Sequence, residues 1–331
     1  MQTNSSSLTI SAPVLSEIRE LERILEQELS KGSPFITKEA LRVLRSGGKR
    51  LRPLLTILFA MTGSEYDAGR ARYAAASIET MHMATLVHDD TIDNAEQRRG
   101  IDTTFKKHGI HTAVYTGDWM LLKSLRMLSR GDTSDSVSTE LLGMLAEGLE
   151  YVCSGEIDQY FGRGRIPTLK TYFKRITGKT AALFGAACSA GAKIAGLSDA
   201  QVRTAAEFGE NFGIAFQIRD DILDMMSTDI KAGKPVENDL REGIVTLPVL
   251  LACNRSKAFR ETVKSYLSDP DHSSASTIIR QAVVHGGLQL AEAQCAIYIS
   301  RCREALDDFP SGPATDDLRI LVDTVFPPLP E

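Results

Sequence analysis

Apolar residues recur at helical spacing along almost the whole chain. The segment VLSEIRELERILEQELS is typical, with Leu15, Ile18, Leu21 and Leu25 three or four positions apart. Alanine, leucine, glutamate and arginine dominate such segments, and the sequence lacks the alternating valine, isoleucine and threonine runs that strands favour. The pattern therefore predicts an all-α protein whose helices are about 15 to 25 residues long.

Short segments rich in glycine, proline, serine and aspartate separate these predicted helices. Examples are SGGKRLRP, MTGSEYDAG and STDIKAGKPVEN. None of them has the composition of an interdomain linker, and a chain of 331 residues is long enough to bury a large core. We therefore expect a single domain over residues 1–331.

Charge and cysteine content exclude several functional classes. The formal net charge is −5, and no basic stripe suggests a nucleic-acid partner. The five cysteines form no CxxC pair, which argues against a disulfide framework or a structural zinc site and favours a reducing compartment. The N-terminal segment lacks the apolar core of a signal peptide, and the longest apolar runs are too short to span a bilayer. These features predict a cytoplasmic protein.

One acidic motif occurs twice in the chain. HDDTID, which begins at His88, returns as RDDILD, which begins at Arg219. Both copies follow an apolar helical segment, and basic residues follow each copy. A single copy is explained as a solvated helix end, but two copies in the same context favour paired functional sites. Because only two copies exist, we do not interpret them as a structural repeat.

The spacing of the aspartates in these motifs suits divalent metal ions. Asp89 and Asp93 lie four residues apart, as do Asp220 and Asp224, so each pair shares one helix face. Like charges on one face repel each other unless cations lie between them. Mg²⁺ prefers hard oxygen ligands, and a few carboxylates typically hold it together with water and substrate phosphates. The motifs therefore predict Mg²⁺ sites that bind a phosphate-containing substrate.

Several cationic residues could hold the phosphate groups of such a substrate. Lys49 and Arg52 follow a glycine pair at a predicted helix start, where anions bind favourably, although a solvated basic turn has the same composition. The GKT segment is not a P-loop, because no glycine-rich loop precedes it. Further candidates are Arg98 and Arg99 after the first motif, Lys179 in the GKT segment, and His82, two helical turns before Asp89.

The HD pair at His88 and Asp89 also suggests an all-α metal phosphohydrolase. Such a site needs a further histidine ligand upstream. No histidine precedes His82, which lies only six residues before His88. This alternative also leaves the second acidic motif unexplained, so we prefer the interpretation with two metal-binding motifs.

An ordered set of motifs between Leu41 and Leu250 resembles the trans-isoprenyl (polyprenyl) diphosphate synthases. The motifs are GGKRLRP, HMATLVHDDTIDNAEQRRG, GKTAALF, FQIRDDILD and GKPVENDLREGIVTLP, in the order in which the family has them. The segments AVYTGDWMLLKSL and CSGEIDQ are most similar to the catalytic large subunit (component II) of bacterial heptaprenyl diphosphate synthase.

The resemblance implies a fold and a reaction. The fold would be the isoprenoid synthase fold, a large helical bundle around a deep central cavity with both acidic motifs at its mouth. The reaction would condense isopentenyl diphosphate with an allylic diphosphate, here farnesyl diphosphate. The expected product has about thirty to forty carbons, such as heptaprenyl diphosphate for a menaquinone side chain. The alternative is a geranylgeranyl or farnesyl diphosphate synthase.

The resemblance also implies roles for individual residues and for partners. The Mg²⁺ ligands would be Asp89, Asp93 and Asp220, with Asp90, Asp221 and Asp224 as auxiliary ligands or hydrogen-bond partners. The isopentenyl diphosphate site would comprise Gly48, Lys49, Arg52, His82 and Arg99. The allylic diphosphate would be held by Arg98, Lys179 and Lys234, with Thr180 and Gln217 facing the developing carbocation. The chain would form a homodimer or a heterodimer with a small companion subunit, and product release would involve transient association with a membrane.

Residues before the first motif bear on product length. Thr85 and Ala84 lie about one helical turn before Asp89, and Met81 lies about two turns before it. The first two are small and Met81 is flexible, so they would leave room for a long product. The alternative is that Ala84 and Thr85 simply pack well at a helix crossing.

Two further alternatives keep the fold and change the activity. A class I terpene cyclase would not need the isopentenyl diphosphate site, and a non-catalytic partner subunit would tend to lose the acidic motifs, which are both intact.

The chain departs from the family at the C-terminus, VFPPLPE, where family members often have basic residues that close over the site. Three prolines in this tail prevent a regular helix end. The sequence therefore does not identify the residues that close the site in this protein.

Overall fold

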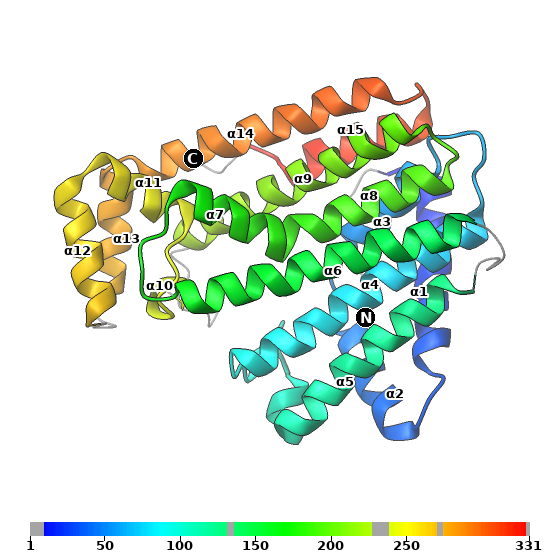
Figure 1. Ribbon diagram of the computed structural model, residues 1–331, viewed down its shortest axis with the longest axis horizontal. Helices are drawn as coiled ribbons and strands as arrows, with labels where there is room; N and C mark the ends of the chain where they lie inside the picture. Colours follow the sequence, from blue (N-terminus) through cyan, green and yellow to red (C-terminus); the bar gives the residue numbers. More distant parts are fainter. Residues whose placement is uncertain (1–9, 131–135, 227–237, 270–273, 329–331) are drawn as a thin grey trace. The chain divides into compact units, whose positions relative to one another are not determined.

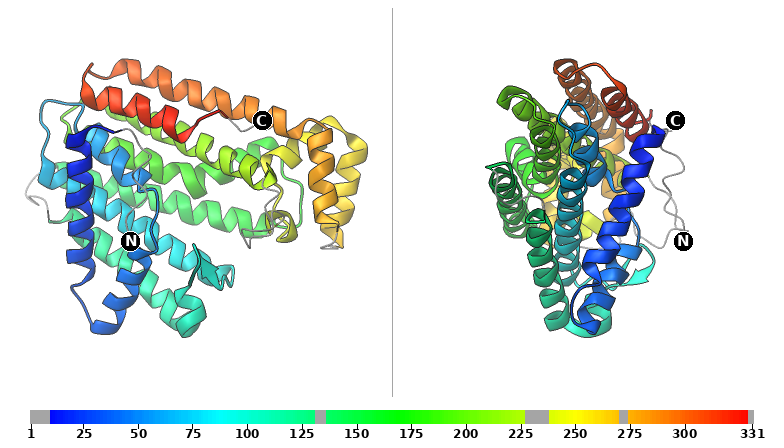
Figure 2. Two further views of the ribbon diagram at one scale, coloured as in Figure 1. Left: turned by 180° about the vertical axis from the view of Figure 1, so that it is seen from behind. Right: turned by 90° about the vertical axis from the view of Figure 1, so that its right-hand side faces the viewer.

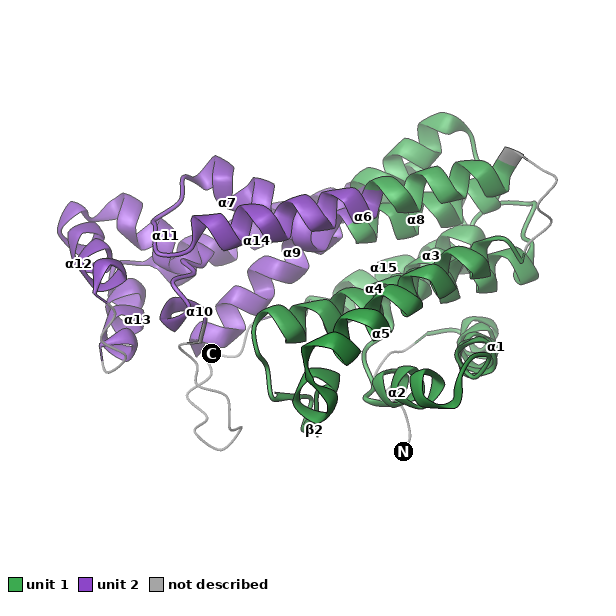
Figure 3. Cartoon of the chain, turned by 60° about the horizontal axis from the view of Figure 1, so that its bottom comes forward, with its two compact units in different colours: residues 1–147, 183–207, 305–327 green, residues 148–182, 208–304, 328–331 purple. Residues whose placement is uncertain are grey.

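The computed structural model describes residues 10–130, 136–226, 238–269 and 274–328. Within these ranges every regular element is a helix or helical turn except for one short hairpin, which confirms the all-α prediction (Figure 1). The chain divides into two compact units. Their boundary crosses α6 (Ser136–Gly162) and α9 (Asp199–Met226), and it also cuts one end residue from α8 (Ala182–Ile194) and from α14 (Gly287–Ala305) (Figure 3). The prediction of a single domain therefore stays a prediction.

Unit 1 comprises residues 1–147, 183–207 and 305–327. Its elements are α1 (Ala12–Leu29), α2 (Pro34–Arg45), α3 (Leu51–Ala60), α4 (Ala68–Ile92), β1 (Gln97–Arg98), β2 (Ile101–Asp102), α5 (Thr104–Leu128), the first part of α6 (Ser136–Gly162), α8 (Ala182–Ile194), the first part of α9 (Asp199–Met226), the 3₁₀ turn η4 (Leu306–Asp308) and α15 (Pro313–Val325).

Helix α4 organises the core of unit 1. It contacts α1, α3 and α5, and it lies alongside α5 (Figure 2). The carboxylate of Asp67 begins the helix by accepting the backbone N–H of Arg70, as an N-cap residue does. Further along, the hydroxyl of Ser77 donates to the carbonyl of Ser124 on α5. The last turn of α4, which carries the first acidic motif, is thus fixed by a helix buried along most of its length.

Unit 2 comprises residues 148–182, 208–304 and 328–331. On α14, the thiols of Cys295 and Cys302 donate to carbonyl groups of α9. Besides the rest of α6 and α9, its elements are α7 (Leu169–Ile176), the π-helical turn η2 (Thr177–Ala181), α10 (Asn238–Arg241), α11 (Leu247–Arg255), α12 (Lys257–Ser268), α13 (Ala275–Val284) and most of α14 (Gly287–Ala305).

The described residues include all five cysteines, and their helices bear on whether the chain could span a membrane. All five cysteines are free thiols, as expected from their spacing, and four of them are buried. Within the described ranges, no helix combines the length and the hydropathy that crossing a bilayer requires. The C-terminal segment begins after α15 ends at Val325, and its last three residues lie outside the described ranges.

Candidate active site

A short hairpin gives two adjacent arginines different partners. Arg98 lies in β1, and the turn residues Arg99 and Gly100 have φ values of 51° and 76°, as a type I′ turn requires. The Nε of Arg98 donates to the carboxylate of Asp90 at 2.7 Å. Arg99 instead donates to the carbonyl of Gly47, in the loop between α2 and α3. The hairpin therefore places one cation beside the acidic motif and the other beside the glycine pair.

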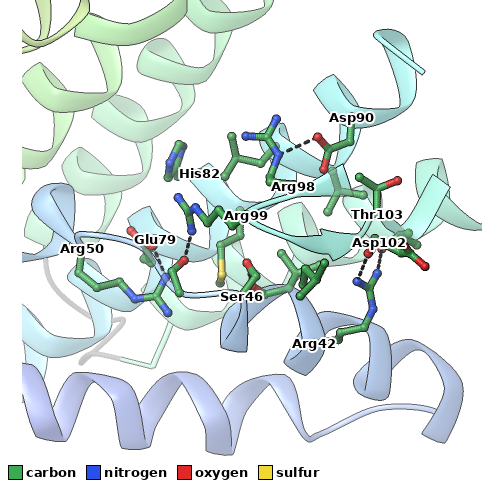
Figure 4. Close-up of a pocket in the computed structure, with 17 residues that line it drawn as sticks. Arg42, Ser46, Arg50, Glu79, His82, Asp90, Arg98, Arg99, Asp102 and Thr103 are labelled. Atoms are coloured by element: carbon green, nitrogen blue, oxygen red, sulfur yellow. Dashed lines mark hydrogen bonds and ion pairs between the residues drawn. The ribbon is translucent and has the colours of Figure 1, made fainter. Parts of the chain in front are cut away.

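A cleft in unit 1 brings several of the expected phosphate-binding residues together. Its volume is about 480 Å³, including the part open to solvent, and its walls come from α2, α4, the loop before α3 and the hairpin. His82, Arg98 and Arg99 lie together at one end of this cleft (Figure 4). Gly48 lies directly against Arg99, because a Cβ at this position would be 2.9 Å from Nη1 of that arginine. Three members of the expected set, Gly48, Lys49 and Arg52, do not line the cleft.

Arg50 is the anchor of the loop between α2 and α3. It has a left-handed backbone, with φ of 51°, and its side chain is buried. The guanidinium donates to Glu79 at 2.6 Å (Figure 4). It also donates to Glu22 at 2.8 Å and to the carbonyl of Leu44 at 2.9 Å. Because these acceptors satisfy the guanidinium, Arg50 stabilises the loop rather than offering a charge to a ligand.

Arg52 combines a buried donor with a cation–π contact. Its Nε is buried and has no hydrogen-bond acceptor within the described part of the chain. The guanidinium stacks on the ring of Phe184 at 4.1 Å. Burial lowers the pKa of Arg52 to about 10, and the carboxylate of Glu79 opposes this shift. A buried guanidinium with an unpaired donor is costly, so the arrangement favours an incoming anion. Its neighbour Lys49 is exposed.

His82 is uncharged in this environment. Burial lowers its pKa well below the usual value, and the charges of Arg52, Arg99 and Arg98 lower it further. A bound phosphate group would screen these cations and raise the pKa of His82 again. The histidine therefore acts as a neutral hydrogen-bonding group in the free protein.

The three aspartates of the first acidic motif have different surroundings. Asp89 is half-buried, and Asp93 is exposed at the C-terminal end of α4. Asp90 is buried, which raises its pKa, and it is paired with Arg98. His88 lies toward α5, where its Nε2 is 3.3 Å from the carboxylate of Asp118. This histidine has a packing partner that the sequence did not suggest.

In unit 2, Asp221 of the second acidic motif is saturated by hydrogen bonds. One carboxylate oxygen accepts the hydroxyl of Tyr172 at 2.7 Å and the backbone N–H of Leu247 at 3.1 Å. The other accepts the amide of Gln217 at 3.1 Å. Burial raises the pKa of Asp221, while these donors oppose the shift. Asp220, by contrast, is only half-buried, and Asp224 is exposed.

Thr180 continues this chain of hydrogen bonds. Its hydroxyl donates to the side-chain carbonyl of Gln217 at 2.9 Å, and Gln217 in turn donates to Asp221. The amide of Gln217 is therefore held in one orientation. Thr180 lies in the π-helical turn η2, a deviation that occurs often at functional sites. The structure thus brings together two residues expected to face a carbocation.

Two cations were expected to hold the allylic diphosphate in addition to Arg98. Lys179, also in η2, pairs with Glu156 of α6 at 2.8 Å. Lys234 lies outside the described residues. A nearby residue not singled out from the sequence is Asp239 of α10. Burial, with the charges of Asp221 and other carboxylates, raises its pKa to about 7.

The donor chemistry of the two motifs fits Mg²⁺ with substrate phosphates. In the described ranges, no three histidine, cysteine, aspartate or glutamate side chains are arranged to hold one metal ion. Each motif instead offers carboxylates spaced four residues apart on one helix: Asp89 with Asp93, and Asp220 with Asp224. Mg²⁺ commonly takes one or two carboxylates and completes its octahedral shell with water and phosphate oxygens.

The residues proposed for chain length lie on different sides of α4. At about 100° per residue, Thr85 is about 40° around the helix from Asp89, and Ala84 about 140°. Ala84 is completely buried in a hydrophobic cluster that includes Ala113 and Met120 of α5. Met81 is also completely buried but does not belong to that cluster. Thr85 is only partly buried, so its position suits a wall facing the Asp89 side.

Sequence reasoning missed several residues that support this site. Glu79 lies three residues before His82 and is the only acid in the long apolar stretch before the first motif, a signal that was available. Glu156 lies in the quoted CSGEIDQ segment but had no predicted role. Glu22 and Tyr172 carry no local signal, because their partners are distant in the sequence.

The sequence matches a known protein family and a relative with a named activity. Residues 34–284 match the model of the polyprenyl synthetase family. Component 2 of heptaprenyl diphosphate synthase from Bacillus subtilis (strain 168) is 36% identical over 303 residues, which cover 91% of this chain and 85% of that protein.

Solved structures agree with the sequence comparison. Heptaprenyl diphosphate synthase from Staphylococcus aureus has a TM-score of 0.88 and 31% identity, covering 94% of this chain and 97% of that one. Polyprenyl synthase from Caulobacter crescentus CB15, complexed with calcium and isoprenyl diphosphate, has a TM-score of 0.87 and 27% identity over 98% of both chains. These matches confirm the expected isoprenoid synthase fold. The chain therefore belongs to the polyprenyl synthetase family and is a prenyltransferase, a trans-prenyl diphosphate synthase.

Proposed function

We propose that this synthase condenses isopentenyl diphosphate with farnesyl diphosphate to an all-E product of about thirty to forty carbons. The preferred product is heptaprenyl diphosphate, for the side chain of a quinone such as menaquinone. The observation that carries the proposed binding of isopentenyl diphosphate is the charge arrangement of unit 1. Arg52 has a buried, unpaired Nε, and Arg99 lies beside the neutral His82 on the helix that ends in the first acidic motif.

The proposed binding roles follow the contacts of each side chain. Isopentenyl diphosphate is held by Lys49, Arg52, His82 and Arg99, with Gly48 leaving room for Arg99. Arg98, Lys179 and Lys234 hold the allylic diphosphate. Thr180 and Gln217 present oxygen atoms to the developing positive charge, and their mutual hydrogen bond supports this role because it fixes the amide.

The proposed reaction is a substitution through a carbocation. The bond between the allylic carbon and its diphosphate oxygen breaks, and the diphosphate leaves with the electron pair. The double bond of isopentenyl diphosphate then attacks the cation, and loss of a proton, taken up by the released diphosphate, leaves a new E double bond. The residues of the site bind, orient and exclude water, because water would quench the cation.

We propose Mg²⁺ as the cofactor. Asp89, Asp93 and Asp220 are the proposed direct ligands, and Asp224 is an auxiliary one. The contacts of Asp90 and Asp221 support hydrogen-bonding roles for those two residues, because Arg98 and three donors already engage them. When bound, the metal ions would neutralise the charge of the leaving diphosphate.

Product length is assigned to the side of α4 that carries Thr85. An extended isoprene unit is about as long as one helical turn, roughly 5 Å. A small side chain at Thr85, followed by the flexible Met81, would admit units beyond a short product. Ala84 contributes less, because it lies within the cluster against α5.

We also propose an oligomeric state and a cellular location for the protein. The chain forms a homodimer or works with a small companion subunit, and the name component 2 of the relative from Bacillus subtilis supports a second component. Exposed apolar residues on α5 support a protein contact there: Ile110, Tyr115 and Leu122 are 55%, 68% and 63% exposed. Residues 1–331 act as one domain in the cytoplasm. The product leaves through transient contact with a membrane, because a long hydrocarbon is poorly soluble in water.

The proposal is tested by incubation of the protein with Mg²⁺, farnesyl diphosphate and labelled isopentenyl diphosphate, followed by sizing of the products. We expect magnesium-dependent products of about thirty to forty carbons. Products that stop at about twenty carbons would contradict the assigned length and favour a geranylgeranyl diphosphate synthase. No elongation of farnesyl diphosphate would contradict it as well and favour a farnesyl diphosphate synthase.

A further inference from the structure

Two glycines bring α6 and the π-helical turn η2 into backbone contact in unit 2. A Cβ on Gly155 would lie 2.5 Å from the amide nitrogen of Lys179, closer than real Cβ atoms approach. A Cβ on Gly178 would lie 2.7 Å from the carbonyl oxygen of Tyr151. Only glycine fits at either position without a shift of the backbone, so this crossing is sterically defined.

The residue after each glycine carries a charge, and the two charges meet. Glu156 follows Gly155, and Lys179 follows Gly178. The ammonium of Lys179 is 2.8 Å from Oε1 of Glu156 and 3.1 Å from Oε2. The two side chains are 24% and 29% exposed, so the ion pair is partly shielded from water but remains accessible. The glycine crossing thus sets the geometry of the ion pair.

The ion pair lies next to the fixed hydrogen-bond chain of the site. Lys179 directly precedes Thr180, whose hydroxyl donates to Gln217. Gln217 is in turn held by Asp221 of the second acidic motif. The ammonium is therefore at a defined place relative to Thr180 and Gln217, the two residues proposed above to face the developing carbocation.

We propose that Glu156 is a positioning residue that occupies the ammonium of Lys179 in the free enzyme and gives it up to a diphosphate. The proposal rests on the function proposed above, in which Lys179 holds the allylic diphosphate. A diphosphate carries more negative charge than one carboxylate, so it displaces Glu156 from the ammonium. When inorganic diphosphate leaves, the carboxylate re-forms the ion pair. Glu156 therefore lowers the affinity for diphosphate and speeds its release.

The test is calorimetric titration of the full chain with inorganic diphosphate in the presence of Mg²⁺, at fixed ionic strength. Glu156→Gln removes the competing charge and keeps the shape of the side chain. We expect its dissociation constant for diphosphate to fall about fivefold, the equivalent of a partly exposed ion pair. Glu156→Asp keeps the charge on a shorter side chain, so its dissociation constant for diphosphate should lie between those of the wild type and Glu156→Gln.

A neighbouring ion pair supplies the matched control. Asp158, also on α6, pairs with Lys174 of α7 at 2.7 Å, and both side chains are more exposed than Glu156 and Lys179. Asp158→Asn makes the same change in net charge, so it should leave the dissociation constant within about twofold of the wild type. If the dissociation constant fell as much in Asp158→Asn as in Glu156→Gln, the effect would come from the overall charge of the protein. That result would overturn the proposal.

Lys179→Gln separates failure of this proposal from failure of the proposed function. If Lys179 binds diphosphate, Lys179→Gln should weaken binding about tenfold or more, and adding Glu156→Gln should then have no further effect. Unchanged or weaker binding in Glu156→Gln, with Lys179→Gln impaired, would overturn the role of Glu156 alone. Wild-type binding in Lys179→Gln would instead remove Lys179 from the diphosphate site.

Steady-state kinetics adds a readout that a purely structural role would not change. Under conditions where diphosphate release limits turnover, Glu156→Gln should lower both the KM for farnesyl diphosphate and kcat. A structural defect would lower kcat without improving KM. A raised KM in Glu156→Gln would contradict the proposal.

Discussion

Neighbouring residues of one basic motif have opposite roles in this structure. In GGKRLRP, Arg50 is buried and satisfied by three acceptors, whereas Arg52 has a buried Nε without an acceptor in the described part of the chain. Both are arginines in the same segment, so composition cannot separate them. The sequence predicted Arg52 as a phosphate ligand from its place in the motif, but the anchoring role of Arg50 depends on Glu22 and Glu79, which are distant in sequence.

Arg50→Lys tests the anchoring role, because it keeps the charge but cannot make the three directed hydrogen bonds. We expect a loss of about 3 kcal/mol in the free energy of unfolding, measured by chemical denaturation. We also expect a KM for isopentenyl diphosphate raised about tenfold, with the KM for farnesyl diphosphate little changed. The control is Arg45→Lys, whose side chain is 65% exposed. Equal effects on both KM values would contradict a local role for this anchor.

His82 makes stability depend on pH. Its pKa is lowered well below the usual value in the folded protein by burial and by neighbouring arginines. The unfolded chain therefore takes up a proton near pH 6.5 that the folded protein does not, and stability falls as pH decreases through that value. Relative to its stability at pH 8, the wild type should lose about 1 kcal/mol more than His82→Gln by pH 5.5. Inorganic diphosphate should reduce this difference, and the same pH dependence in both proteins would contradict the assignment.

Helix α4 shows how far an element can be predicted from sequence. Its apolar spacing predicted a helix that ends at the first acidic motif, and the structure has α4 from Ala68 to Ile92. The side of the helix that each residue occupies was harder to predict. Ala84 and Thr85 are adjacent and both small, but only the partners of α4 in space reveal that Ala84 packs against α5. The hairpin after α4 was missed entirely, because each of its strands has only two residues.

Thr85→Phe tests the assignment of product length to one side of α4. A bulky ring at this level should shorten the main product made from farnesyl diphosphate to about twenty carbons, while isopentenyl diphosphate is still consumed. Ala84→Ser is the control on the other side of the helix, and it should leave product length unchanged. Product sizing by chromatography decides the matter. Wild-type length in Thr85→Phe would show that the growing chain does not pass this residue.

At the scale of the whole molecule, the family and the fold class followed from ordered motifs and helical periodicity. These features are spread along the chain, so the prediction of family and fold does not depend on the interpretation of any single residue. Contacts between distant segments did not follow from the sequence. The ion pair of Glu156 with Lys179, for example, depends on a glycine crossing that no single motif encodes.

We expect the exposed residues Tyr115 and Leu122, which share one face of α5, to be covered by a second protein. Leu122→Glu should therefore reduce the molar mass of the complex measured by light scattering. Val284→Glu is the control, because Val284 is 83% exposed but lies on α13. An unchanged molar mass in Leu122→Glu would place the contact elsewhere. Full long-chain synthesis by the purified chain alone would show that no companion subunit is essential.

We propose that the first acidic motif binds the metal–diphosphate group on which turnover depends. The most direct measurement is the rate at which labelled isopentenyl diphosphate is incorporated by Asp89→Asn, compared with the wild type under saturating Mg²⁺ and farnesyl diphosphate. We expect a loss of at least about 100-fold, with the helical circular dichroism spectrum unchanged. A rate within about twofold of the wild type would contradict the claim, because removal of a metal-binding carboxylate cannot leave the leaving diphosphate equally stabilised.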